Sequence, residues 1–175
     1  MEKGFNNTGI QEVLSAVNVP KGSFYHYFKS KEDFGICVLE HYAEASIEMT
    51  RSVLGDTNIS PLQRLKNFFD FSRQKMAANQ YCGGCLFGNL SQEMGDQSPA
   101  FETLLEKKWQ LMRVGFMNCI EEGRNLGEIP PGLPAEVLAD FMINSWQGAL
   151  LRMKVSKSPQ PMDVFTKAVF ERLVA

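Results

Sequence analysis

The sequence predicts an all-α fold, and three observations support this prediction. Apolar residues recur three and four positions apart along most of the 175 residues, which is the spacing that places side chains on one face of an α-helix. Serine–proline pairs, glycines and asparagines interrupt the pattern where helices would begin and end. No stretch of the sequence alternates apolar and polar residues in the way that a half-buried strand requires.

Two short helices are expected first, separated by a tight turn. The first follows Thr8, a suitable N-cap because its hydroxyl can accept a hydrogen bond from a free backbone N–H. It ends at Asn18, a residue that tolerates the left-handed conformation found after helices. Pro20 opens the second helix, since a proline in the first helical turn sacrifices no hydrogen bond. This arrangement is typical of a helix-turn-helix.

Longer helices follow these two. Ser30 is the expected N-cap of a helix over about 31–54, which Gly55 interrupts. Serine–proline pairs and glycine breaks mark the remaining starts and ends. The further helices are expected over residues 60–79, 85–94, 98–122, 134–155 and 161–174.

The helix over 134–155 is apolar on more than one face, so it must be buried on two sides. Ser145, Gly148 and Ala149 are small enough to let another helix approach closely. The final helix adds apolar residues to the same surface, namely Val164, Phe165, Ala168, Val169 and Leu173. Together they predict a homodimer held by an intersubunit four-helix bundle.

Composition and charge exclude several classes of protein. A net charge of −2 does not suit a protein that coats nucleic acid, so any contact with nucleic acid must be local. No apolar run approaches the roughly 20 residues needed to cross a bilayer. No signal peptide is visible either, so we expect a cytoplasmic protein without membrane contact. No catalytic triad, phosphate-binding glycine loop or metal cluster is evident, and we expect no enzymatic activity, cofactor or metal.

The stretch VPKGSFYHYFKSKEDF, residues 19–34, gathers lysines and aromatic residues. It carries three lysines before its first acid, a local charge of +3. Lysine, serine and tyrosine side chains are groups that hold a helix against phosphates. We expect the inward side of this helix to carry Phe24, Tyr27 and Phe28, packed against residues of the first helix that include Val17.

The longer stretch TGIQEVLSAVNVPKGSFYHYFKSKEDF resembles the DNA-binding motif of the TetR family of transcriptional repressors. The resemblance implies a homodimeric repressor, with a DNA-binding head over residues 1–36 and a helical effector-binding and dimerisation body over 37–175. It implies DNA contacts from the first motif helix, the recognition helix and the start of the next helix. These residues are Thr8, Gly9 and Gln11, then Lys21, Gly22, Ser23, Tyr25 and His26, and finally Lys31.

Members of that family normally have a further helix before this motif, whereas three residues precede Gly4 in this sequence. We therefore expect the head to be incomplete at its N-terminus. Residues 1–36 hold four lysines and four acidic residues, so the head has no net charge to draw it to DNA. The alternative interpretation is a headless helical dimer that binds a ligand but not DNA.

A second resemblance lies in the body. GGCLFGNLSQEM and LLRMKVSKS are similar to segments of family members that respond to reactive electrophiles or small unsaturated acids, such as the repressor of N-ethylmaleimide reductase. Cys85 is the candidate sensing residue, because free N–H groups at a helix start favour a thiolate and should lower the pKa of its thiol. Lys154 would pair with that sulfur if the two lie close. The alternatives are a small buried residue at a helix start and a lysine that complements the helix dipole.

The other cysteines carry weaker signals. Cys82 and Cys85 form a C-x-x-C pair, for which a redox disulfide is an alternative. Zinc would need two more ligands at matching spacing. Cys37 and Cys119 fall within expected helices and are interpreted as core thiols.

Large, soft side chains on four expected helices favour a pocket for a small apolar or amphiphilic effector, although such residues more often fill a core. The candidate effector-binding residues are Phe68, Phe71, Phe87, Trp109, Met112, Phe116 and Trp146. The polar residues expected to orient the ligand are Asn89, Gln92, Asn144 and Gln147. With the motif, these residues predict a DNA-binding transcriptional repressor that a small molecule or cysteine modification releases from its operator.

Overall fold

The computed structural model describes residues 3–174, so Met1, Glu2 and Ala175 at the ends of the two expected domains lie outside the described residues. The helices are α1 (Ile10–Ala16), α2 (Lys21–Tyr27), α3 (Lys31–Leu54), α4 (Pro61–Ala78), α5 (Leu86–Met94), α6 (Pro99–Asn125), α7 (Ala135–Ser156) and α8 (Gln160–Ala168). A π-helical turn over Val169–Leu173 follows α8. No strand occurs within residues 3–174, and the predicted all-α fold is confirmed.

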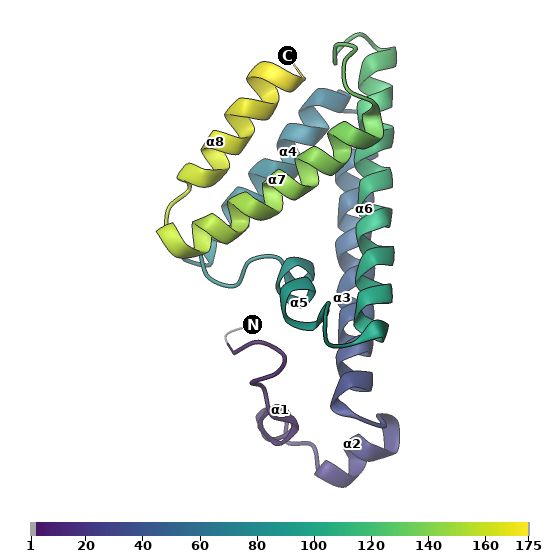
Figure 1. Ribbon diagram of the computed structural model, residues 1–175, viewed down its shortest axis with the longest axis vertical. Coiled ribbons are helices and arrows are strands. Elements are labelled where there is room, and N and C mark those ends of the chain that lie inside the picture. The colour runs from purple at the N-terminus through teal and green to yellow at the C-terminus, as the bar shows by residue number, and fades with distance from the viewer. Residues whose placement is uncertain (1–2, 175) are drawn as a thin grey trace.

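The helices form two parts of unequal size (Figure 1). α1 and α2 make a small unit at one end of the molecule, and α3 leads from this unit into the body. α6 lies beside α3, while α4, α7 and α8 pack at the far end from α1 and α2. The short helix α5 lies between the two parts, close to the N-terminal segment.

Serine side chains fix the starts of α3, α4 and α6. Ser30, Ser60 and Ser98 each accept a hydrogen bond from the backbone N–H three residues further on, at 3.0, 3.4 and 3.2 Å. At the start of α3 the carboxylate of Asp33 also accepts a hydrogen bond from the backbone N–H of Lys29, the residue before the N-cap, at 2.9 Å. These are the N-caps that the sequence predicts.

Thr8 does not cap α1, contrary to expectation. Its hydroxyl donates instead to the Gly4 carbonyl at 2.6 Å, and the extended residue before the helix is Gly9. The helix starts one residue later than expected, which leaves the Thr8 side chain inside the preceding turn. Asn18 adopts the expected left-handed conformation, with φ of 55°.

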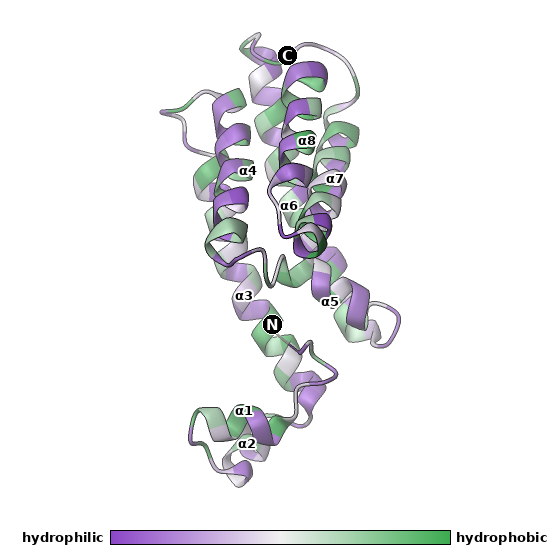
Figure 2. Cartoon of the chain, turned by 90° about the vertical axis from the view of Figure 1, so that its left-hand side faces the viewer, coloured by the Kyte–Doolittle hydropathy of each residue, from purple (hydrophilic) through white to green (hydrophobic). Residues whose placement is uncertain are grey.

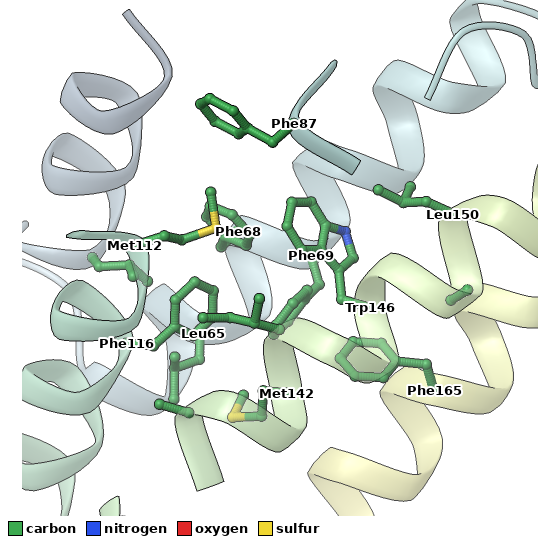
Figure 3. Packing of buried hydrophobic residues seen from close by; sticks show 14 of the residues in the cluster. Leu65, Phe68, Phe69, Phe87, Met112, Phe116, Met142, Trp146, Leu150 and Phe165 are labelled. Carbon is green, nitrogen blue, oxygen red and sulfur yellow. The ribbon is translucent and has the colours of Figure 1, made fainter. Parts of the chain in front are cut away.

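The core of the body is rich in aromatic rings. Phe68 and Phe69 on α4, Phe116 on α6 and Trp146 on α7 pack mostly edge to face, with Phe68 lying 4.9 Å from Phe116 and 5.3 Å from Trp146 between ring centroids (Figure 3). Phe165 of α8 joins them, 4.8 Å from Phe69. Such contacts stabilise beyond the area they bury. They lock α4, α6, α7 and α8 into one body.

The hydropathy of the helices agrees with this packing. Figure 2 shows α4 largely hydrophilic on the side toward the viewer, whereas hydrophobic residues recur along α7. α7 indeed buries nine side chains against its own chain and still exposes Val137, Phe141, Leu151 and Val155.

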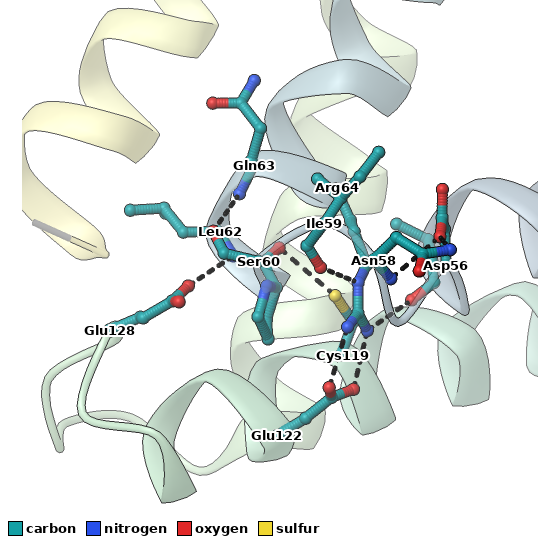
Figure 4. Close-up of polar contacts among 12 residues, drawn as sticks. Asp56, Asn58, Ile59, Ser60, Leu62, Gln63, Arg64, Cys119, Glu122 and Glu128 are labelled. Atoms are coloured by element: carbon teal, nitrogen blue, oxygen red, sulfur yellow. Dashed lines mark hydrogen bonds and ion pairs between the residues drawn. The ribbon is translucent and has the colours of Figure 1, made fainter.

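A buried arginine joins the ends of three helices at the top of the body (Figure 4). Arg64 of α4 is 2% exposed and donates to both carboxylate oxygens of Glu122 on α6, at 2.7 and 2.8 Å. It also donates to the carbonyls of Leu54 and Ile59, at 3.2 and 2.7 Å. The guanidinium lowers the pKa of the Glu122 carboxyl, mainly through this hydrogen bonding. A charge that is paired and fully hydrogen-bonded can remain in a protein interior.

Candidate nucleic-acid interface and effector cavity

The recognition helix predicted from the sequence presents its polar residues to solvent. Lys21, Gly22, Ser23 and His26 are exposed on α2, and Tyr25 is 52% exposed. Phe24, at 4% exposure, faces the opposite way and anchors the helix. The polar side is therefore free to lie against another molecule.

Two expectations about the inward side of α2 are wrong. Tyr27 is 75% exposed, because the rings of Phe28 and Phe34, 5.2 and 5.5 Å from Phe24, occupy the space beneath the helix. Val17 is 59% exposed, and Leu14 is the buried residue of α1. Tyr27 therefore extends the exposed aromatic surface of α2 and was missed as a candidate contact residue.

The other expected contact residues differ in how free they are. Gly9 and Gln11 are exposed near the start of α1, whereas Thr8 is half-buried with its hydroxyl bound to the Gly4 carbonyl. Lys31 donates to the Asn6 carbonyl at 3.0 Å, and its ammonium lies 4.7 Å from the centre of the Phe5 ring. Thr8 and Lys31 thus hold the turn before α1.

A cavity of about 240 Å³ lies between α3, α4, α6 and α7. Of the expected effector-binding residues, Phe68, Phe71, Met112 and Trp146 line it. Phe87, Trp109 and Phe116 lie outside its lining. Phe116 is fully buried in the aromatic core.

Phe87 and Trp109 pack against each other, with ring centroids 5.7 Å apart. The Trp109 indole N–H donates to the Ser91 hydroxyl at 3.1 Å. These two aromatic residues therefore hold α5 against α6 instead of facing the cavity. They illustrate that a large aromatic side chain alone does not identify a pocket.

Polar groups that the sequence analysis missed line the same cavity. They come from α3 and α4 and comprise Tyr42, Ser46, Ser72, Lys75 and Asn79. The Ser72 hydroxyl accepts from the Trp146 indole N–H at 2.9 Å. Helical spacing would have identified the α3 contribution, since Tyr42, Ala45, Ser46 and Met49 fall on one face. A mixed lining of this kind suits an amphiphilic ligand.

Cys85 lies at the wall between this cavity and a second one. It is the residue before the first turn of α5 and lines both spaces. Burial raises the pKa of the Cys85 thiol, and backbone N–H groups of α5 oppose that rise without cancelling it. The expectation of a lowered pKa is therefore wrong, because removing a thiolate from water costs more than the helix start returns.

The second cavity, of about 220 Å³, lies between α5 and α7, and its wall mixes polar side chains with glycines and leucines. Lys154 lines it with Cys85, so the two candidate sensing residues face one space, and the Lys154 ammonium donates to the Asn89 side-chain oxygen at 3.3 Å. Gln147 contributes a buried side-chain nitrogen that has no hydrogen-bond partner within residues 3–174.

The polar residues expected to orient an effector are divided between separate spaces. Asn89, Gln92 and Gln147 line the second cavity, and Asn144 lines a further hollow between α6 and α7. Gly84, with φ of +89°, lets the backbone pass Lys154, because an added Cβ would lie 3.2 Å from that side chain.

The remaining cysteines are also free thiols. Cys82 is exposed, and its sulfur lies 3.5 Å from the Lys157 ammonium nitrogen. Cys119 is buried, donates to the Pro61 carbonyl and has a pKa raised by burial to about 11. Cys37 is exposed and not the core thiol that was expected. Within residues 3–174, no three side chains of histidine, cysteine, aspartate or glutamate gather to hold a metal ion.

The outer surface of α7 and α8 carries a groove of about 470 Å³. Gly148, Val164 and Ala168 face outward there, and Val164 is 61% exposed. Phe165 and Val169 are buried within their own chain, so part of the set expected at a dimer interface serves the core instead. No helix within residues 3–174 is both long and apolar enough to cross a membrane.

Comparison with protein families gives two matches along the chain. Residues 1–34 match "Bacterial regulatory proteins, tetR family", and residues 61–169 match "Tetracyclin repressor-like, C-terminal domain". The second match alone covers more than half of the 175 residues.

Curated relatives are similar along nearly the whole chain. The repressor DhaR of Mycobacterium sp. (strain GP1) is 38% identical over 99% of this chain and 86% of its own length. The regulator AcuR of Cereibacter sphaeroides is 35% identical over 95% and 76%. The repressor NemR of Escherichia coli is 30% identical over 93% and 82%.

Solved structures show the same similarity. The regulatory protein TetR from Rhodobacter sphaeroides superimposes with a TM-score of 0.91 at 34% identity, over 99% of this chain and 92% of that one. E. coli NemR, in what its title calls the reduced form, superimposes with a TM-score of 0.87 at 29% identity, over 99% and 89%.

Proposed function

Because this chain belongs to the TetR family of bacterial transcriptional regulators, we propose that it is a repressor released from its operator when a small molecule enters the cavity or modifies Cys85. That it is a DNA-binding regulator follows from the family. The mode of release is the proposal. The observation that carries it is the position of Cys85, on the wall between the main cavity and a second cavity that Lys154 also lines.

For the DNA contacts, we assign the exposed side of α2. Lys21 and Tyr25 hold phosphates, while Ser23 and His26 reach base edges, with Gly22 allowing close approach. Gly9 and Gln11 of the first motif helix add contacts to the sugar-phosphate backbone of the DNA. Thr8 and Lys31 serve by fixing the turn that carries α1, which departs from the direct contacts implied by resemblance. The head ends at residue 36 and the effector-binding body starts at 37, within α3.

For assembly, we assign the outer surface of α7 and α8 to a homodimer. Exposed apolar side chains, including Phe141 and Val164, surround a groove floored by Gly148. Burying such a surface against a second copy removes apolar area from water. Two copies then present two recognition helices, as operators with two half-sites require.

For covalent sensing, the reaction is addition of the Cys85 thiol to an electron-poor double bond, such as that of a maleimide. The thiolate sulfur forms a bond to one alkene carbon, and the adjacent carbon takes up the proton that the thiol lost. The ammonium of Lys154 and the unpaired amide nitrogen of Gln147 face the same cavity. In this proposal they stabilise the thiolate and the oxygen that gains charge during addition.

The test measures how far N-ethylmaleimide releases operator DNA from the unchanged protein and from variants with one cysteine substituted. We expect Cys85→Ser to lose the response, and Cys82→Ser and Cys37→Ser to keep it. Full release of Cys85→Ser would instead leave non-covalent binding in the cavity as the mode of control. A gel shift with the DNA upstream of the gene separates the repressor from the alternative, a helical dimer that binds a ligand but no DNA.

A further inference from the structure

The carboxylate of Glu93, near the end of α5, holds the turn that begins the head. One of its oxygens accepts from the Phe5 backbone N–H at 2.8 Å and the other from the Asn6 N–H at 2.6 Å. Two successive backbone donors thus point at one carboxylate that lies 87 and 88 residues away in the sequence. Hydrogen bonds to a charged group are stronger than those between neutral groups.

The turn is shaped to receive this carboxylate. Gly4 has φ of +76°, and a Cβ at this position would lie 2.8 and 2.9 Å from the two Glu93 oxygens. A side chain is therefore excluded by both the backbone conformation and the contact. The Asn6 side chain adds a hydrogen bond to Gln97, just beyond α5, at 3.2 Å.

The other sides of the turn are fixed by α3 and α6. The Phe5 ring packs edge to face on Phe101 of α6, 5.2 Å between centroids, and a Cβ at Gly35 of α3 would lie 2.3 Å from it. Lys31 binds the Asn6 carbonyl from the start of α3. The turn over residues 4–6 is therefore a junction between the head and three helices, and α5 contributes through Glu93.

The opposite end of α5 forms the wall of both cavities. Cys85 precedes its first residue, and Gly88 in its first turn faces Gln147 of α7 closely enough that an added Cβ would lie 2.5 Å from the Gln147 oxygen. α5 has nine residues, so it spans about 13 Å at the rise of an α-helix. A helix this short moves as a rigid element, so displacement of its first turn displaces Glu93.

We propose that Glu93 is the positioning residue through which α5 sets the position of the head, so that events at the cavity reach α1 and α2 by way of the Phe5 and Asn6 amides. The consequence for DNA binding rests on the function proposed above. The mechanical link itself does not, since it concerns contacts within one chain. A separate contact between the start of α3 and the start of α6, from the Ser98 hydroxyl to the Glu32 carboxylate, does not involve Glu93 and is kept when Glu93 is changed.

The experiment perturbs one end of α5 and observes the other by NMR. Gly88→Met introduces a side chain whose Cβ would lie 2.5 Å from the Gln147 side-chain oxygen, so that either Gln147 or α5 must move, and methionine is a good helix former. Alkylation of Cys85 with N-ethylmaleimide, verified by mass, is the second perturbation. The readout is the change in the backbone amide resonances of Phe5 and Asn6, in the absence of DNA.

Each perturbation is applied in three backgrounds: unchanged, Glu93→Gln and Glu102→Gln. Glutamine at 93 replaces one acceptor oxygen with an NH₂ group, so one of the two hydrogen bonds is lost. Glu102, exposed on the first turn of α6, supplies a control with the same change of charge.

We expect Gly88→Met to shift both amide resonances in the unchanged and Glu102→Gln backgrounds, and the shift to fall by about half with Glu93→Gln, because one of the two hydrogen bonds is lost. Equal shifts in all three backgrounds would overturn the proposal. The proposal would also be overturned if the α5 resonances shift and the Phe5 and Asn6 amide resonances do not. Failure of the proposed function is a separate result: the unchanged protein would stay bound to operator DNA after Cys85 is alkylated.

Discussion

The head and the body differ in how the sequence specifies their function. In the head, the residues assigned to DNA lie close together in the sequence, between Gly9 and His26, and most of them are on the short helix α2. Leu14 and Phe24 are the buried side chains of α1 and α2. In the body, the cavity is lined by residues from position 42 to position 150, on four helices. A function carried by neighbouring residues can be recognised as a motif. One carried by distant residues depends on packing that the sequence does not display.

The largest expected effect separates the stability of the two parts. Phe69 is fully buried among the aromatic rings of the body, so Phe69→Ala should lower the free energy of unfolding by about 4 kcal/mol. Phe24→Ala should leave the main unfolding transition in place and abolish DNA binding. Denaturant unfolding followed by circular dichroism measures the first, and a gel shift the second. An equal loss of stability for both variants would mean that head and body unfold as one unit.

The next effect concerns the surface between copies of the body. Gly148→Glu should dissociate the dimer, because an unpaired charge buried at an interface costs several kcal/mol. No atom of residues 3–174 lies within 4 Å of a Cβ added at Gly148, so the fold of the single chain should tolerate the change. Ala149 is buried within its own chain, so substitution there would also damage the fold. Sedimentation of Gly148→Glu, with Val155→Glu as the exposed control on the same helix, gives the answer. An unchanged dimer would exclude this surface.

The third effect compares two cysteines at the edge of the cavity. Burial raises the pKa of the Cys85 thiol, so its thiolate fraction is small at neutral pH and grows about tenfold per pH unit until the pKa is passed. Cys82 is exposed beside Lys157 and should react first at neutral pH. Alkylation rates measured for each cysteine by mass spectrometry from pH 6 to pH 10 test this order. Faster alkylation of Cys85 at pH 7 would show that a charge in the second cavity outweighs its burial.

The same contrast explains how much could be predicted from the sequence. The helices and their serine caps were predicted because capping is local: the Ser30 hydroxyl accepts a hydrogen bond from the backbone N–H of Asp33, only three positions further on. The motif predicted α2 and its exposed side for the same reason. Tyr27 was misplaced, since the inward position is decided by Phe34, which belongs to α3 and reaches back beneath the helix.

The cavity was predicted less well because it depends on contacts between helices. Phe87 and Trp109 are aromatic residues at suitable spacing, yet they face each other across α5 and α6 and line no part of the main cavity. Cys85 was placed correctly at a helix start, whereas the direction of its pKa followed from burial that α7 and α3 impose. The contact of Glu93 with the head joins positions 87 and 88 apart and has no signal in the sequence.

The smallest effect tests whether Lys21 contacts a DNA phosphate while Lys31 only holds the turn before α1. A phosphate contact contributes about 0.9 to the slope of log affinity against log salt concentration. Lys21 is exposed on α2 and makes no side-chain hydrogen bond or ion pair within residues 3–174, so Lys21→Ala should reduce the slope by about that amount. Lys31 is occupied by the Asn6 carbonyl and the Phe5 ring, so Lys31→Ala should weaken binding with little change of slope. Fluorescence anisotropy across a salt series distinguishes the two. A full slope change for Lys31→Ala would show that this lysine leaves the turn when DNA binds and then holds a phosphate. The role implied by the family resemblance would then be correct for the DNA-bound protein.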